Sequence, residues 1–245
     1  MKIDILTLFP EMFVPLKESI LGRAEKKGIL EINLTNIRDY STDKHRKADD
    51  YPFGGGNGMV MSAQPIFDAL RDIKAEGKRV IYMSPRGRVL NQEIIQDLAE
   101  EKDLVILCGH YEGVDQRVID YWNMEEVSIG DYILTGGELP AMVLVDSVAR
   151  MLPEVLSSLD AALGESIYSG LLEYPQYTKP RTFEGMDVPD VLVSGNHKAI
   201  ALWQFEKSLE FTKERRPDLF EKYLEKESEF SKDEKKILKK FTEIP

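Results

Sequence analysis

The first part of the chain alternates apolar and polar stretches in the order strand, helix, strand. Residues 2–9 form a short apolar run that predicts a buried strand. Residues 10–27 have the spacing of an amphipathic helix, which we expect to stop at Gly28. Residues 30–34 then alternate apolar and polar side chains, as a strand does. This opening predicts a β-α-β unit, in which the two strands run parallel.

The same alternation continues through the middle of the chain. Residues 64–75 and 91–101 have helical spacing, whereas the apolar runs 79–83, 104–108 and 126–129 predict strands. The segment between residues 38 and 61 is polar and glycine-rich, so we expect a long loop there. Strands that alternate with helices predict an α/β domain, with a largely parallel sheet and helices on both faces.

Each of the last three predicted strands is followed by a turn of unusual composition. These turns are S-P-R-G at 84–87, G-H-Y-E-G at 109–113 and the start of S-I-G-D-Y-I-L-T-G-G-E-L-P-A-M at 128–142. Glycine exposes backbone N-H and C=O groups and reaches angles closed to other residues. One such turn is most simply a tight connection, but three at neighbouring strand ends predict a ligand site, because ligands of parallel sheets bind beyond the carboxyl ends of the strands.

The apolar helix expected at residues 140–152 contains a single arginine, Arg150, four residues after Asp146. That spacing permits an ordinary ion pair along the helix. A cation in apolar, acid-flanked surroundings would equally suit a developing oxyanion on a substrate, since a partly buried charge needs a strong acceptor. The residues alone leave both interpretations open.

The pattern weakens after this helix and then returns. Residues 157–175 lack strong helix or strand signals, which indicates a linker, whereas helical spacing resumes around residues 199–212 and again from 217. We therefore expect three parts: an α/β domain over 1–156, a linker over 157–175 and a small helical domain over 176–245.

The composition is that of a soluble globular protein, with 245 residues of which 42% are hydrophobic and 31% charged. No apolar run is long enough to span a bilayer and the start has no cleavage pattern, so we expect a cytoplasmic protein. The single Cys108 and three scattered histidines indicate no metal site, and Cys108 is expected to pack in the core.

The net charge of −11 argues against indiscriminate nucleic-acid binding. Basic residues nevertheless gather at 44–47, at Lys179 and Arg181, and at 213–216, while residues 91–174 are strongly acidic. The glycine-rich stretch 54–58 lies next to the first basic group, and it contains neither a Walker motif nor a dinucleotide fingerprint. This distribution suits either a solvated surface loop or a selective polyanion contact.

Ordered motifs over nearly the whole chain resemble one family, the bacterial tRNA (guanine-N1)-methyltransferases. The motifs are L-F-P-E-M-F (8–13), the acidic and glycine-rich loop (49–61), S-P-R-G-R (84–88), C-G-H-Y-E-G (108–113), the 128–142 segment, G-L-L-E-Y-P-Q-Y-T (170–178), S-G-N-H (194–197) and R-R-P-D-L (215–219). The resemblance implies a trefoil knot at the end of the α/β domain, S-adenosylmethionine as methyl donor, and a homodimer with active sites at the subunit interface.

The resemblance also implies site residues. The methyl donor would contact Pro85, Gly109, Tyr111, Glu112, Gly113, Ile129, Gly130, Asp131, Tyr132, Ile133, Leu134, Gly136, Gly137 and Pro140. The tRNA would contact Arg46, Gly55, Gly56, Gly58, Glu173, Lys179, His197, Arg215 and Arg216.

The implied reaction methylates N1 of the guanosine at tRNA position 37, next to the anticodon. Guanine N1 is a poor nucleophile until a base removes its proton, and the charge that then forms on O6 needs a fixed cation. By family position the linker carboxylate Glu165 is the base and Arg150 stabilises O6. The family commonly has Asp where this chain has Glu165. Mg²⁺ has been linked to the family, but the sequence indicates no protein site for it.

Two other functions fit parts of the sequence. A knotted methyltransferase acting on ribosomal RNA or on a ribose hydroxyl would need no proton acceptor at Glu165. A catalytically silent RNA- or nucleotide-binding module has only the Glu-for-Asp difference in its favour.

Overall fold

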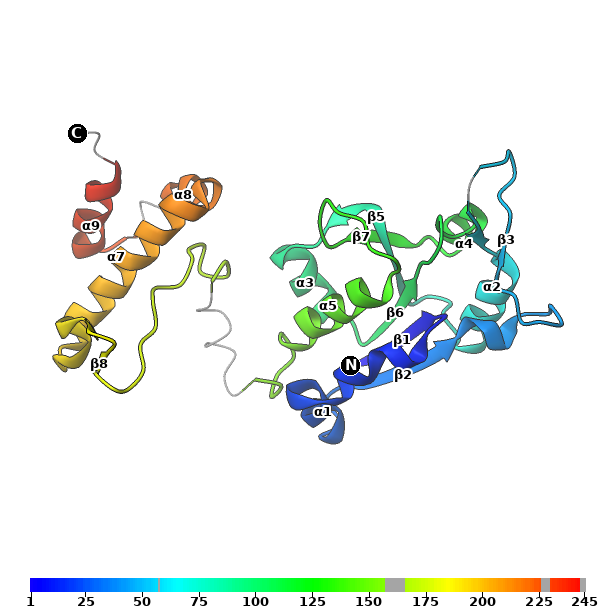
Figure 1. The fold of residues 1–245 in the computed structure, drawn as a ribbon, viewed down its shortest axis with the longest axis horizontal. Helices are drawn as coiled ribbons and strands as arrows, with labels where there is room; N and C mark the ends of the chain where they lie inside the picture. Colours follow the sequence, from blue (N-terminus) through cyan, green and yellow to red (C-terminus); the bar gives the residue numbers. More distant parts are fainter. Residues whose placement is uncertain (57, 157–165, 226–229, 243–245) are drawn as a thin grey trace. The chain divides into compact units, whose positions relative to one another are not determined.

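The computed structural model describes residues 1–56, 58–156, 166–225 and 230–242. The chain forms two compact units, Met1–Leu159 and Asp160–Pro245, and each is described by itself. Figure 1 shows the first unit as a sheet with helices and the second as a group of helices.

The first unit is built on a five-stranded parallel sheet in the order β2-β1-β6-β5-β7. Its strands are β1 (Lys2–Thr7), β2 (Glu31–Asn36), β5 (Arg79–Val89), β6 (Asp103–Cys108) and β7 (Glu125–Ser128). The central strands are apolar on both faces and are buried almost throughout. The predicted α/β class with a parallel sheet is therefore confirmed, while the knotted path stays a prediction.

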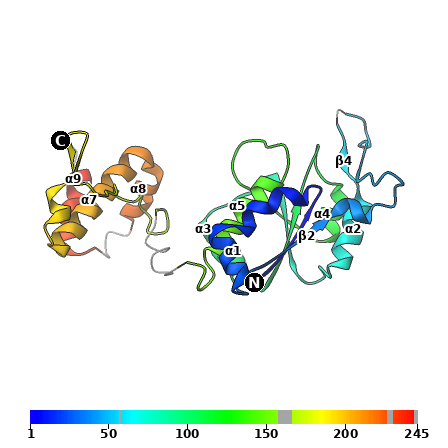
Figure 2. The ribbon, with the colours of Figure 1, turned by 60° about the horizontal axis from the view of Figure 1, so that its bottom comes forward.

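Helices cover both faces of this sheet, as Figure 2 shows. One core cluster joins the sheet to η1 (Pro10–Lys17), α1 (Ser19–Lys26), α3 (Gln92–Ala99) and α5 (Glu138–Ala149). The other cluster joins it to η2 (Ile37–Tyr40), α2 (Ala63–Asp72) and α4 (Gln116–Tyr121). Burial of the sheet on both sides explains why its strands are continuous apolar runs rather than alternating ones.

The prediction of a single helix over residues 10–27 is wrong, because the structure has a break in the middle of this segment. The segment divides into the 3₁₀ helix η1 and the α-helix α1, with Glu18 extended between them (ψ 168°). Pro15 lies inside η1 and has no N-H to donate, so an α-helix cannot run through it without losing a bond. The predicted stop is correct, because Gly28 has a φ of 73°.

The turn expected at residues 84–87 and the long loop expected at 38–61 also differ from the structure. Strand β5 continues to Val89, and its pairing with β7 shifts register between Met83 and Arg88. The segment 38–61 contains most of η2 and a small antiparallel pair, β3 (Asp49–Asp50) with β4 (Val60–Met61). Helix α4 was not predicted, because its six residues are too short to show a period.

The second unit is helical, apart from one small hairpin. It contains β8 (Thr182–Phe183), β9 (Met186–Asp187), η3 (Asp190–Val193), α7 (His197–Arg215), α8 (Pro217–Leu224) and α9 (Lys232–Thr242). Leu209, Phe220 and Leu238 are buried at its core. The two expected helical stretches are present, and the hairpin was not predicted.

Charged pairs lie near the amino-terminal ends of the parallel strands. Asp4 is 3% exposed and accepts a hydrogen bond from Lys78 at 3.1 Å. Arg79 donates to Glu125 at 2.7 Å. Burial acts to raise the pKa of Glu125, but hydrogen bonds from Arg79 and Arg88 outweigh it and lower that pKa. These pairs stabilise the sheet near the amino-terminal ends of its strands, and they involve no group at the carboxyl ends.

The burial of β6 predicts that the same Val→Ala substitution has different effects on stability at two positions. Val105 is fully buried in the centre of the sheet, whereas Val89 is 50% exposed at the end of β5. Val105→Ala should lower the free energy of unfolding by about 2 kcal/mol, because it removes buried methyl groups and leaves a cavity. Val89→Ala should change it by less than about 0.5 kcal/mol. Urea unfolding measures both, and equal losses would contradict this account of the core.

Candidate functional site

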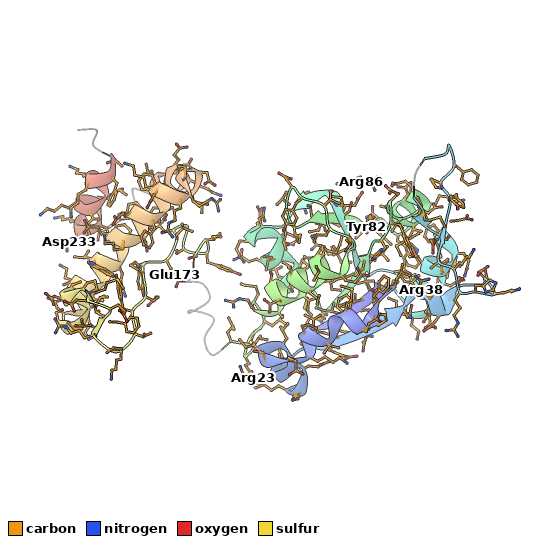
Figure 3. The ribbon with its side chains drawn as sticks, viewed as in Figure 1. Arg23, Arg38, Tyr82, Arg86, Glu173 and Asp233 are labelled. Carbon is orange, nitrogen blue, oxygen red and sulfur yellow. The ribbon has the colours of Figure 1, made fainter. Side chains whose placement is uncertain are left out.

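A cavity of about 280 Å³ opens at the carboxyl ends of β6 and β7, beside the middle of β5. It is lined by residues 82–86, 109–114, 127–130, 132–137 and 140, so all three glycine-containing segments contribute to it. Tyr82 and Arg86, both from β5, are labelled in Figure 3. The structure therefore brings together three segments that are far apart in the sequence.

The residues expected around the methyl donor converge on this cavity. All of them except Asp131 line it, namely Pro85, Gly109, Tyr111, Glu112, Gly113, Ile129, Gly130, Tyr132, Ile133, Leu134, Gly136, Gly137 and Pro140. Asp131 is exposed in the same loop but is not among the lining residues.

Backbone contacts attach the loop after β7 to the end of β6. Gly137 N donates to Gly109 O at 2.7 Å, and His110 forms an isolated antiparallel bridge with Gly136. A Cβ at Gly137 would lie 2.7 Å from Gly109 N and 2.8 Å from Cys108 Cα, too close for any side chain. Glycine is therefore required at position 137 because of this approach, not because of its own backbone angles, which are ordinary (φ −82°).

The tip of the same loop presents apolar side chains to solvent. Gly130 has a φ of 147°, and a Cβ there would lie 2.5 Å from the Tyr132 ring. Tyr132 donates its hydroxyl to Ile129 O at 3.2 Å, which closes the turn. Tyr132 and Ile133 are 56% and 79% exposed, so the loop has apolar surface available for a ligand or a second chain.

The floor of the cavity contains a buried tyrosine. Tyr82 lies against Gly109, where a Cβ would be 2.7 Å from its ring. Burial raises the pKa of Tyr82, so the phenol is a neutral hydrogen-bonding group in the physiological range. Cys108 is fully buried, as expected for a packing residue. Tyr82 was not among the expected site residues, although it lies at the end of the strand predicted before S-P-R-G.

The rim of the cavity is joined to the glycine-rich loop. Glu112 N donates to Met59 O at 3.0 Å and Met61 N donates to Gly113 O at 2.9 Å. A Cβ at Gly58 would lie 2.7 Å from Glu112 Cγ, so the end of the loop lies against the rim. Gly58 and Met59 are thus neighbours of the cavity rim, which the separation in sequence did not indicate.

Tyr111 on the rim has an uncommon backbone conformation. Its φ is 58°, in the left-handed region that non-glycine residues rarely adopt. Arg38, labelled in Figure 3, donates to its hydroxyl at 3.4 Å from η2. His110 beside it packs its ring 5.0 Å from the ring of Phe9 and 5.3 Å from the ring of Tyr111.

A buried polar pair lies behind the cavity wall. Glu138, the first residue of α5, is 1% exposed and accepts a hydrogen bond from Thr7 Oγ1 at 2.8 Å. Its other oxygen lies 3.8 Å from His110 Nε2. Thr7 is itself fully buried at the end of β1. We did not predict this pair, because Thr7 and Glu138 are 131 residues apart.

Arg150, one of the two expected catalytic residues, does not line the cavity. Arg150 is half-buried and directly follows α5, whose twelve residues span about 18 Å from the cavity end. Its backbone N-H donates to Asp146 O at 3.2 Å. Glu165 lies outside the described residues, as does Asp160.

The expected tRNA contacts fall into two sets, one in each unit. Arg46, Gly55, Gly56 and Gly58 are exposed in the first unit, and Arg46 pairs with Asp39 at 3.1 Å. Glu173, Lys179, His197, Arg215 and Arg216 are exposed in the second unit. Asn196 caps α7, so His197 is not used as the cap.

Arg215 stacks on the Phe211 ring at 4.5 Å, and Arg216 donates to Asp218 at 2.6 Å. Each guanidinium therefore already has a partner on its own helix or the next one.

Across residues 1–56, 58–156, 166–225 and 230–242, no helix is both long and apolar enough to cross a membrane. Within the same ranges no three His, Cys, Asp or Glu side chains are grouped in a way that could hold a metal ion.

Comparison with known proteins identifies the family. The family model described as tRNA (Guanine-1)-methyltransferase TrmD matches residues 1–222. The tRNA (guanine-N(1)-)-methyltransferase of Clostridium novyi is 56% identical over 97% of both chains. That of Clostridium acetobutylicum is 54% identical over 97% of this chain and 96% of its own, and that of Ruminiclostridium cellulolyticum is 56% identical over 91% and 97%. The chain therefore belongs to the tRNA (guanine-1)-methyltransferase family.

Proposed function

We propose that this protein transfers a methyl group from S-adenosylmethionine to N1 of guanine at tRNA position 37. The observation that carries the proposal is the cavity, because all but one of the residues that the family pattern assigns to the donor line it together, at the ends of β6 and β7 and beside β5. Membership of the family over residues 1–222 supports guanine N1 as the acceptor.

The cavity suits a nucleoside-containing donor. Gly109, Gly136 and Gly137 bring bare backbone to its wall, and Ile129 and Leu134 add apolar surface. The residues that would hold the donor are those shared by the family pattern and the cavity. When bound, S-adenosylmethionine supplies an electrophilic methyl group and leaves as a neutral thioether.

The acceptor requires a base and a cation. We assign the base to Glu165, which takes the N1 proton as the electron pair of that bond becomes available to the methyl group. We assign the cation to Arg150, whose guanidinium offers planar paired donors to the charge that forms on O6. No metal is needed for either role, and Mg²⁺ would act beside the protein groups if it takes part.

We propose that the working unit is a homodimer. In one subunit Arg150 is the length of α5 away from the cavity, so a complete site needs groups from a second copy. Leu139 and Val143 on α5 are 49% and 45% exposed, and Val14 on η1 is 61% exposed. Neighbouring exposed apolar side chains of this kind mark a protein interface.

The parts of the chain then divide the work. We assign donor binding and the knotted core to residues 1–156, the base to the linker 157–175, and tRNA recognition to residues 176–245 together with the glycine-rich loop. Position 37 lies in a single-stranded loop, so its base can be splayed out to reach a protein site. This function places the protein in the cytoplasm, where tRNA is modified.

Methyl transfer to defined tRNAs tests the proposal. Labelled S-adenosylmethionine should modify an unmodified tRNA with guanosine at position 37 and leave the same tRNA with adenosine there unlabelled. Label on both tRNAs, or transfer to ribosomal RNA instead, would overturn the assignment. A protein that binds tRNA but transfers no label would be the silent binding module.

Replacement of the proposed base should stop chemistry and spare binding. Glu165→Gln should lower the rate of methyl transfer about 10²- to 10⁴-fold, because proton removal contributes at this scale, while the Kd of S-adenosylmethionine stays within about twofold. Single-turnover kinetics and calorimetry measure the two quantities. Wild-type turnover would move the role to Asp160 or Glu173, and Asp160→Asn and Glu173→Gln would then test those two positions.

Replacement of the proposed O6 cation tests geometry as well as charge. Arg150→Lys keeps the positive charge but loses the planar fork, so we expect the rate to fall about tenfold or more with donor binding unchanged. Arg117→Lys is the matched control, since Arg117 is an exposed arginine paired with Asp115 outside the cavity. Equal activity of Arg150→Lys and wild type would exclude a role for the fork.

A further inference from the structure

Glu138 is a buried acid that the proposed reaction does not use. One carboxylate oxygen accepts the Thr7 hydroxyl at 2.8 Å, and Thr7 Oγ1 in turn accepts from Phe9 N at 2.9 Å. The backbone donor on Phe9 fixes the direction of the chain of bonds, so the Thr7 proton points to Glu138. The carboxylate is therefore held in one place at the start of α5.

This acid lies directly behind the cavity wall. A Cβ at Gly136 would be 2.5 Å from Glu138 Oε2, so the carboxylate touches the loop that lines the cavity. Its second neighbour, His110, also lines the cavity. Burial, with a further contribution from Glu138, raises the pKa of the Cys108 thiol at the end of β6 beside Gly109.

The charge of Glu138 has little compensation from the protein. Of the residues that the structure describes, only His110 lies within ion-pair distance of it, at 3.8 Å, and neither Lys nor Arg does. The start of α5 provides a favourable helix dipole, which supplies a partial charge only. A buried carboxylate without a full counter-charge attracts a cation that enters the neighbouring cavity.

We propose that Glu138 makes the cavity selective for a positively charged donor over its neutral product. The proposal rests on the proposed function, in which the donor is a sulfonium and the product a thioether of nearly the same shape. The charge is the main difference between donor and product. The buried carboxylate therefore strengthens binding of the sulfonium donor and adds little to binding of the neutral thioether. Binding of the product is thereby kept weak relative to the donor.

The other acids of this region are poorer sources of selectivity. Glu112 and Asp131 are exposed, so water and salt screen their charges. Glu126 pairs with Arg86 at 3.2 Å, which cancels its charge locally. Glu138 combines burial with incomplete pairing, and this combination gives a charge its longest effective reach.

Calorimetry on the full-length protein with three ligands tests the proposal. The ligands are S-adenosylmethionine, the neutral S-adenosylhomocysteine, and an analogue with an ammonium in place of the sulfonium. Glu138→Gln keeps the shape and can still accept from Thr7. It should weaken both cationic ligands roughly tenfold relative to the neutral one.

Two further variants separate charge from structure. Asp4→Asn removes another buried acid, which lies on β1 near the amino-terminal ends of the strands. It should leave the ratio of cationic to neutral affinity unchanged. Thr7→Val removes the hydroxyl that positions the carboxylate but keeps the charge, so it should lower the ratio of cationic to neutral affinity by less than Glu138→Gln does. If Glu138→Gln does not fold, the wild type still decides, because equal affinities for the neutral ligand and the two cationic ligands would overturn the proposal.

The remaining outcomes are also decisive. A Glu138→Gln protein that loses affinity equally for all three ligands would show a purely structural role, and one with wild-type affinities for all three would show no role; either result overturns the proposal. A wild-type protein that binds none of the three would overturn the proposed function itself. A wild-type protein that binds all three while Glu138→Gln keeps its ratio leaves the function intact and removes only the selectivity.

Discussion

The contact between Gly137 and the end of β6 is the constraint on which the cavity depends. The Gly137 amide donates to Gly109 O at 2.7 Å, and no side chain fits between the two backbones. This single approach fixes the loop after β7 against the turn after β6 and starts α5 at Glu138. The cavity wall, the direction of α5 and the burial of Glu138 all follow from it, because α5 begins where the two segments meet.

The two ends of the parallel strands differ in their polar groups. Near the amino-terminal ends, Asp4 and Glu125 accept hydrogen bonds from cationic side chains, so their charges are matched within the fold. At the carboxyl ends, backbone groups, aromatic rings and one incompletely paired carboxylate surround a cavity. Polar groups that are satisfied internally stabilise the sheet, whereas those left with spare capacity are available to a ligand.

The sequence allowed the sheet and the cavity to be predicted because both depend on local patterns. Continuous apolar runs mark doubly covered strands, and glycine turns at their ends mark the ligand edge. Contacts between segments that are distant in the sequence are not marked by any local pattern. Thr7 with Glu138, Arg38 with Tyr111, and Met59 with Glu112 depend on how the strands are ordered, which periodicity does not encode. The break at Glu18 was visible in principle, since Pro15 cannot sit inside an α-helix without cost.

The hydrogen bonds that join residues 59–61 to the rim turn have a thermodynamic consequence. Met59 O and Met61 N are bonded to Glu112 and Gly113, so the base of the glycine-rich loop and the cavity rim share one small network. A molecule that restricts the rim also restricts the base of the loop and reduces the entropy that the loop has left to lose. Linkage makes any such effect reciprocal, so restriction of the loop base would restrict the rim as well. These bonds join segments that are 52 positions apart in the sequence, counted from Met61 to Gly113.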